Sequence, residues 1–327
     1  MTLLPHASRA IAPIPRASPG MQLRLRKFGR KMEFYAPGLK RWQSSEWKPE
    51  SSRRFVPISV TGTACALQCD HCRSKVLQGM VTPTRERDLF ETAAELKAKG
   101  TEGILVSGGS TRSGEVPLMP QIEALSRIKE DLGMRVIVHT GVIDRELARG
   151  LASAGVDGVM LDIIGADETV KEVYHLDCGA RAFDRSLDFL CERGLKVIPH
   201  IVLGLHYGRF VGEDRALDMI ASHPVSTLVL VVMTPLVGTP MAAASPPAIE
   251  EVSDFFAAAR QRLPDIPINL GCGRPMGETK QRLDRSAVDH GLNGIAYPAE
   301  GIIEYARASG LEPTYYEYCC SLTWSDL

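Results

Sequence analysis

Residues 103–138 read GILVSGGSTRSGEVPLMPQIEALSRIKEDLGMRVIV and contain the unit that predicts the fold. Two short apolar, β-branched runs, Gly103–Val106 and Arg135–Val138, flank an amphipathic stretch with helical spacing, Met119–Leu132. Gly133 follows that stretch, at the position where a left-handed residue often ends a helix. The order of strand, helix and strand, with both strands continuously apolar, predicts a parallel sheet covered on both faces.

The same alternation continues on both sides of this unit. The eight apolar runs that we interpret as strands are Phe55–Val60, Gly103–Val106, Arg135–Val138, Gly158–Leu161, Lys196–Val202, Thr227–Met233, Ile266–Leu270 and Gly294–Ala296. The helical stretches that follow them are Thr84–Lys99, Met119–Leu132, Asp144–Ala154, Arg181–Arg193, Glu213–Ser222, Pro247–Arg262, Lys280–His290 and Glu300–Ser309. Eight such units predict an α/β fold, a closed (βα)8 TIM-type barrel, with a six-stranded partial barrel as the alternative.

The two ends of the chain differ from this regular middle. Residues 1–32 contain no Asp or Glu, several Arg and Lys, and four prolines, so we expect a basic, disordered extension, with an upstream mis-assigned start or a transit peptide as alternatives. Residues 33–327 are expected to form one barrel domain, because no linker-like stretch interrupts 55–310. The tail after the last helix is expected to fold over the mouth of the barrel.

Composition excludes several classes of function. The chain has 327 residues, of which 44% are apolar and 24% charged, and its net charge is −1, the balance of a soluble globular protein. No bulk charge points to nucleic acid, and no apolar run is long enough to span a membrane. The eight cysteines occur without a secretory signal, so metal binding or chemistry in the cytoplasm is expected in place of a disulfide framework.

Three of these cysteines, Cys65, Cys69 and Cys72, lie within eight residues directly after the first predicted strand. A tight loop with three and two intervening residues brings three thiols onto a small volume, which suits a 4Fe–4S cluster. Three ligands leave the fourth iron open to bind a ligand of its own. Zinc bound by the three cysteines and His71 is the alternative.

This segment resembles the signature CxxxCxΦC of the radical S-adenosylmethionine superfamily, with His71 at the usually aromatic position. The resemblance implies that the open iron binds S-adenosylmethionine and that reductive cleavage yields a 5′-deoxyadenosyl radical, which abstracts a substrate hydrogen. The protein then orients cofactor and substrate and excludes water.

The resemblance also implies further cofactor contacts at the ends of later strands. Ser107-Gly108-Gly109-Ser110 corresponds to the family's GGE segment, whose backbone holds the methionine amino group, although Ser110 replaces the Glu. Asp162 is the candidate for the ribose hydroxyls, with a turn-capping aspartate as the alternative. The candidates beside adenine or closing on the cofactor are Ile201, Val202, Gly204 and Met233. His200 faces the barrel lumen or is an ordinary core residue.

Three more cysteines form a second candidate group. Cys272 follows the seventh predicted strand in GCGRP, and Cys319 and Cys320 lie in the tail YYEYCCSL. A tail folded over the mouth would bring the three thiols together to hold a second 4Fe–4S cluster, used as a sulfur source or electron relay. Arg274, a nearby Ser or exogenous sulfide would be the remaining ligand. Incidental buried thiols are the alternative. Cys191 is interpreted as core packing.

The motifs together resemble biotin-synthase-like radical proteins, and among these a subunit of the two-component lipoyl synthase. The segments that carry this resemblance, besides the cysteine loop, are FYAPG (34–38), GCGRP (271–275), NGIAYP (293–298) and the terminal CCSL (319–322). The resemblance implies sulfur insertion into an octanoyl chain on a lipoyl-carrier protein, a second radical subunit, and ferredoxin or flavodoxin as electron donor. Other radical enzymes, such as a biotin-type thiolase, mutase or lyase, and a non-catalytic iron–sulfur or zinc protein are the alternatives.

Overall fold

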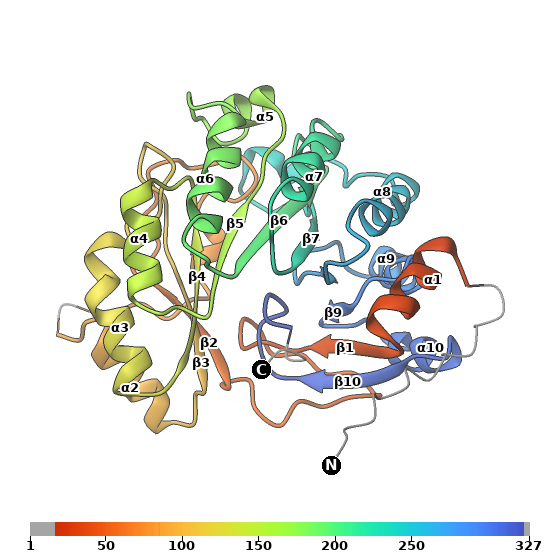
Figure 1. Cartoon of the computed structure of the whole chain (residues 1–327), viewed down its shortest axis with the longest axis horizontal. Helices are drawn as coiled ribbons and strands as arrows, with labels where there is room; N and C mark the ends of the chain where they lie inside the picture. Colours follow the sequence, from red (N-terminus) through yellow and green to blue (C-terminus); the bar gives the residue numbers. More distant parts are fainter. Residues whose placement is uncertain (1–16, 85, 324–327) are drawn as a thin grey trace, which may run out of the picture.

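Ten parallel strands form one curled sheet in the computed structural model, which describes residues 17–84 and 86–323 (Figure 1). The strands lie in the order β10-β1-β9-β8-β7-β6-β5-β4-β3-β2, and all eight predicted strands are present, as β2 to β9. The strand bounds are β1 (Lys31–Tyr35), β2 (Phe55–Ser59), β3 (Gly103–Ser107), β4 (Arg135–Thr140), β5 (Gly158–Asp162), β6 (Val197–Leu203), β7 (Leu228–Val232), β8 (Ile268–Leu270), β9 (Gly294–Ala296) and β10 (Glu312–Tyr316). The α/β, TIM-type fold class is confirmed.

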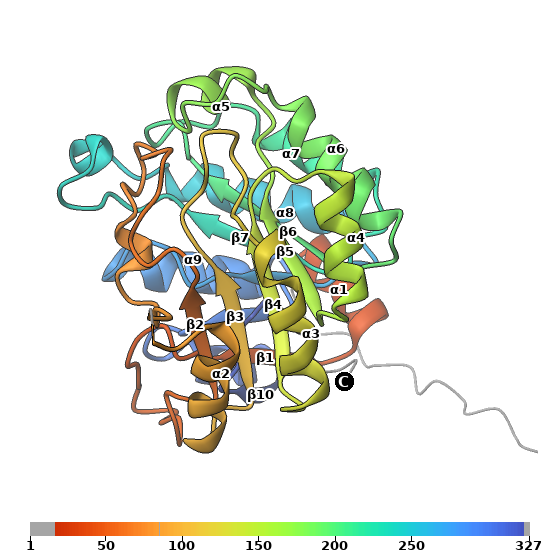
Figure 2. The same cartoon turned by 90° about the vertical axis from the view of Figure 1, so that its left-hand side faces the viewer.

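Helices cover the outer face of this half-barrel (Figures 1 and 2). Their bounds are α1 (Pro19–Phe28), α2 (Leu89–Ala98), α3 (Ile122–Glu130), α4 (Arg145–Ser153), α5 (Asp167–Glu172), α6 (Arg181–Cys191), α7 (Glu213–Ala221), α8 (Ile249–Arg262), α9 (Glu278–Asp289) and α10 (Ile302–Ala308), with 3₁₀ turns η1 (Lys75–Leu77), η2 (Met119–Gln121) and η3 (Pro240–Ala243). No helix among the described residues is long and apolar enough to cross a membrane.

Alternate residues of each strand enter two different cores, because side chains of a strand point to opposite faces. On β4, for example, Val136 and Val138 pack under the helices, whereas Ile137 packs inside the curled sheet. The same parity places Ser107, His139, Asp162 and His200 on the inner face. The strand register therefore decides which side chains can line a central site.

The N-terminal prediction was wrong for residues 19–32, which form α1 and the start of β1. Ser18 caps α1 by accepting a hydrogen bond from the Met21 N–H at 3.0 Å, and Pro19 occupies the first helical turn. β1 then pairs with β9 and β10. Residues 1–16 of the expected extension lie outside the described residues.

The edges of the sheet, β2 and β10, form no ladder with each other in the described ranges, and side chains bridge them instead. Glu317, just after β10, accepts from Arg54 Nε at 3.0 Å and from the Ser51 N–H at 3.2 Å. The Tyr318 hydroxyl donates to Glu102, and its ring packs edge-on against Phe55. The sheet is thus open, unlike the closed barrel predicted, and side chains of the first tail residues bridge its two edges.

Beyond these contacts the tail turns into the half-barrel, a correction to the expected position over the mouth. Cys319, Cys320 and Leu322 are buried in the core of the inner face. Asn269 Nδ2, on β8, donates to the Cys320 carbonyl at 2.7 Å. The reason is that an open sheet leaves an apolar interior uncovered, and the tail fills it.

A buried ion group fixes the segment that carries Cys272. Asp284 on α9 is fully buried and accepts from Arg274 at 2.6 Å and from Lys280 at 3.0 Å. Arg274 also donates to the Gly271 carbonyl at 2.6 Å. The guanidinium is therefore occupied on both sides, so the expectation that Arg274 ligates a metal is not supported by its surroundings.

Replacing Asp284 with Asn is expected to lower the free energy of unfolding by about 3–5 kcal/mol, because it leaves buried cations without a counter-charge. Denaturant unfolding of the two proteins measures the difference. The control is Glu250→Gln, whose exposed pair with Arg282 at 2.8 Å should contribute about 0–1 kcal/mol. Equal losses in both variants would contradict the argument.

Candidate radical site

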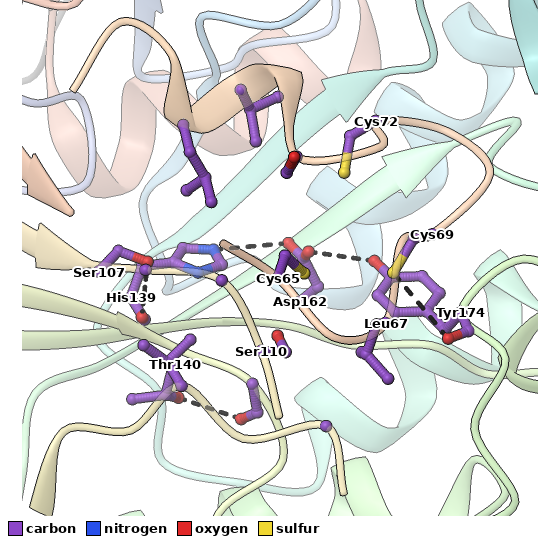
Figure 3. A pocket seen from close by; sticks show the side chains of 18 of the residues that line it. Cys65, Leu67, Cys69, Cys72, Ser107, Ser110, His139, Thr140, Asp162 and Tyr174 are labelled. Atoms are coloured by element: carbon purple, nitrogen blue, oxygen red, sulfur yellow. Dashed lines mark hydrogen bonds and ion pairs between the residues drawn. The ribbon is translucent and has the colours of Figure 1, made fainter. Parts of the chain in front are cut away.

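The cysteine loop follows β2 at the carboxyl edge of the sheet, where the active groups of such barrels lie (Figure 3). Cys69 and Cys72 are 6% and 8% exposed, and Cys65 is half-buried. Burial raises the pKa of Cys72 to about 11 and raises that of Cys69 further, and the neighbouring thiols add to both shifts. Three adjacent thiolates are therefore unfavourable here unless a bound metal compensates their charge.

A cavity of about 270 Å³ lies beside the loop. Cys65, Cys69 and Cys72 line one side, and the ends of β3, β4 and β5 line the other with Ser107, His139 and Asp162 (Figure 3). The predicted loop residues and strand-end residues are thus brought together, as the fold class led us to expect.

The glycines after β3 support the cysteine loop directly. A Cβ on Gly109 would lie 2.0 Å from the Ala64 carbonyl oxygen and 2.5 Å from Cys65 Cβ, so only glycine fits. The Gly109 N–H donates to Thr61 Oγ1 at 2.7 Å, and the Ser110 carbonyl accepts from the Ala66 N–H at 2.8 Å. Part of this backbone is therefore used to hold the loop, a role that sequence reasoning missed.

Replacing Gly109 with Ala is expected to displace Cys65 and lower iron occupancy after anaerobic reconstitution by at least about tenfold, because backbone atoms cannot yield to the new methyl group. Iron and sulfide content per chain measures this. Gly79→Ala in the same loop is the matched control, since its Cβ would meet nothing nearer than 3.8 Å. Full iron content in Gly109→Ala would contradict the prediction.

Asp162, at the end of β5, is an ionised group facing the cavity. Its burial opposes ionisation, but His139, whose Nε2 lies 3.7 Å from Asp162 Oδ1, and then His200 and His71 outweigh burial and hold the Asp162 pKa well below its usual range. Tyr174 donates to Asp162 Oδ2 at 3.1 Å. The Asp162 carboxylate is thus held in place and can accept hydrogen bonds from the hydroxyl groups of a ligand.

His71 provides a second polar contact. Its Nδ1 is buried and has no hydrogen-bond partner among the described residues. The ring lies 5.3 Å from the Tyr174 ring, and burial lowers the His71 pKa, which favours the neutral imidazole. An unpaired buried nitrogen beside three thiols fits a site that is completed by a polar ligand.

Residues 59–220 match the family model of the radical SAM superfamily. The chain belongs to the radical SAM superfamily. Membership implies a 4Fe–4S cluster and S-adenosylmethionine as cofactors, and the three converging thiols with the unpaired His71 nitrogen fit such a group.

Curated relatives of this radical SAM chain include biotin synthases. Biotin synthase 2 of Corynebacterium diphtheriae is 27% identical over 252 residues, covering 72% of this chain and 73% of the relative. The biotin synthase of Acinetobacter baumannii is 26% identical over 227 residues, covering 66% and 67% of the two chains.

Solved structures agree in fold. HydG, a maturase of FeFe-hydrogenase, aligns with a TM-score of 0.61 at 13% identity, over 90% of this chain and 67% of that one. Methylornithine synthase (PylB) aligns with a TM-score of 0.57 at 14% identity, over 90% and 87%. At these identities the likeness concerns the fold alone.

The residues expected beside adenine do not line the large cavity of the radical SAM site. Ile201 packs on the outer face of β6, and with Val202 it lines a separate, small cavity against α7. Gly204 lies against Pro247, and its N–H donates to Glu213 at 3.0 Å. Met233 is buried in the outer core. Ile201 has the parity of the outer face, whereas Val202 and Met233 keep the parity of the inner-face residues Ile198 and Val231 but pack against the outer core near the strand ends.

The second cysteine group is gathered inside the half-barrel. Cys272, Cys319 and Cys320 belong to the same inner-face core. The interaction with the Cys320 thiol lowers the pKa of Cys319 and raises that of Cys320, whereas burial and then Cys319 raise the pKa of Cys272. Cys178 is exposed and Cys191 half-buried on α6, so neither joins the group.

The two cysteine groups are linked by histidines of the inner face. The His139 and His200 rings lie 5.5 Å apart, edge to face. His139 lines the cavity, whereas His200 Nε2 lies 3.5 Å from Ser321 Oγ, beside Cys320. Burial and then His139 lower the His200 pKa to about 4, so this imidazole is neutral at pH 7. His200 thus faces the lumen, one of its two predicted positions.

Proposed function

We propose that this radical SAM enzyme inserts sulfur at unactivated carbon, with an octanoyl chain on a lipoyl-carrier protein as substrate. The observation that carries the proposal is the second group of thiols, Cys272, Cys319 and Cys320, on the inner face that also carries the radical site. The relationship to biotin synthases supports a reaction that forms carbon–sulfur bonds.

In this proposal Cys65, Cys69 and Cys72 hold the 4Fe–4S cluster, and Cys272, Cys319 and Cys320 hold a second one. Together with S-adenosylmethionine, the first cluster supplies hydrogen-atom abstraction from carbon that is neither acidic nor electrophilic. The side chains and backbone of the protein bind and orient the cofactor and the substrate. Asp162 accepts from ligand hydroxyls, and Ser107 and the backbone of Gly108, which line the cavity, contact the polar end of the cofactor.

The walls of the cavity suit an alkyl chain. Leu67, Leu77, Met80 and Val116 present apolar surface to the same space as the three thiols. Such walls exclude water from the reacting carbon, which protects a reactive intermediate from side reactions. The proposal includes ferredoxin or flavodoxin as electron donor, and a second radical subunit that completes the product.

The test is anaerobic reconstitution with S-adenosylmethionine, reductant and an octanoylated carrier peptide, followed by mass spectrometry of the peptide. A mass gain of one sulfur supports insertion that a partner subunit completes, and a gain of two supports a complete reaction by this chain. Deoxyadenosine without any mass gain would instead favour a radical mutase, lyase or thiolase with another substrate, and would refute the lipoyl assignment.

A further inference from the structure

Asp70 is a buried carboxylate in the middle of the cysteine loop, between Cys69 and Cys72. Only 7% of the surface of Asp70 is exposed. The Asp70 N–H donates to the Val173 carbonyl at 2.9 Å, which places this part of the loop on the segment between α5 and α6. A buried carboxylate requires hydrogen-bond partners. The partners of Asp70 therefore show which segments the cysteine loop is attached to.

The partners come from two other loops of the same edge. His175 Nε2, between α5 and α6, lies 3.0 Å from Asp70 Oδ1. The Tyr207 hydroxyl, between β6 and α7, donates to Asp70 Oδ2. Arg73, which is exposed, approaches Oδ1 only at 3.5 Å. One carboxylate thus joins three segments that are distant in sequence.

Backbone strain is concentrated at the same junction. His175 and Tyr207 both have positive φ, 59° and 56°, although neither is glycine. Of the six non-glycine residues with positive φ in the described ranges, five belong to the cysteine loop or to these two contacting segments. Such conformations persist only where the surroundings determine them, and the shared contact of His175 and Tyr207 is Asp70.

The β6–α7 loop has a second anchor next to Tyr207. His206 is buried, and its Nδ1 lies 3.1 Å from Thr169 Oγ1 on α5. Its Nε2 lies 3.6 Å from Glu168 and 3.5 Å from Glu172. The loop is therefore fixed to α5 through His206, so loss of the Asp70 contact would free its other side, toward the cysteines.

We propose that Asp70 is a positioning residue that latches the cysteine loop to the β6–α7 loop through Tyr207 and to the α5–α6 segment through His175, and thereby protects the bound cluster from oxygen. Only the protection of the cluster from oxygen rests on the proposed function, because it requires Cys65, Cys69 and Cys72 to hold a cluster. The latch itself is a property of the protein without the cluster, and the two parts are tested separately.

The first measurement is hydrogen–deuterium exchange of the cluster-free protein. In Asp70→Asn the amides of residues 66–78 and 204–211 should exchange about tenfold faster than in wild type, because a charge-assisted contact is lost. Tyr207→Phe removes only a hydroxyl from a partly exposed ring. The amides of both segments should therefore exchange about threefold faster than in wild type. The control is Asp177→Asn, an exposed aspartate two residues from His175, which should leave exchange unchanged.

The second measurement is the rate at which the reconstituted protein loses its visible cluster absorbance in air. Asp70→Asn should lose it about tenfold faster, with an unchanged midpoint of global unfolding. Exchange at the wild-type rate in both Asp70→Asn and Tyr207→Phe would overturn the latch. Faster exchange with an unchanged rate of cluster loss would overturn its protective role. A wild-type protein that assembles no cluster would refute the proposed function, whereas the exchange result would still decide the latch.

Discussion

Replacing Cys69 with Ala is expected to lower the rate of deoxyadenosine formation from S-adenosylmethionine by more than about a thousandfold, the loss that follows removal of a group essential to the chemistry. The thiol is buried beside Cys72 and against the Tyr174 carbonyl, at 3.9 Å, so no solvent ligand can replace it in the same geometry. Anaerobic reconstitution, reduction and chromatography of the products measure the rate.

The three cysteines of this loop should act as one unit. Cys65→Ala, Cys72→Ala and the triple variant are each expected to be as inactive as Cys69→Ala, because a cluster with an open iron needs all three ligands. Cys178→Ala is the matched control, since that thiol is exposed and outside the site. A colourless, four-coordinate zinc ion in the loop of oxygen-free wild type would contradict the assignment.

The sequence predicted the eight strands β2 to β9 because these are continuously apolar runs followed by clear helical spacing. It missed β1 and β10, whose residues mix charge with aromatic groups and whose pairing depends on contacts across almost 300 residues. Lys31 of β1, for example, pairs with Glu312 of β10. Local pattern alone cannot give such pairings, because tertiary contacts stabilise them.

The sequence predicted those parts of the candidate site that lie at or after the carboxyl ends of strands. Asp162 ends β5, and Cys65 and Gly109 lie in the loops that follow β2 and β3, so the parallel sheet brings all three to one edge. The contact of Ile201 with adenine stays a prediction. Its place outside the cavity could not be predicted from the sequence, because the face of a strand changes with every residue and the register of β6 is set by its neighbours. The partners of Asp70 could not be predicted, since they lie on separate loops without a motif.

The triple variant Cys272→Ala, Cys319→Ala, Cys320→Ala is expected to bind about four irons per chain, where wild type binds about eight. It should still form deoxyadenosine within a fewfold of the wild-type rate, because the thiols of the first site are untouched. Sulfur transfer to the octanoyl peptide should disappear. Iron analysis, product chromatography and peptide mass measure the three effects on the same preparations.

This combination separates the sulfur-donor role from a structural one. Cys319 and Cys320 are buried among apolar side chains of the inner face, so replacing them with Ala also removes packing contacts. Cys191→Ala, at a half-buried thiol of α6 outside both sites, is the control for this loss of packing. A merely structural role would lower both activities together, since His139 and His200 connect the tail to the radical site. Four irons in wild type, or sulfur insertion by the triple variant, would exclude the second group as the source of sulfur.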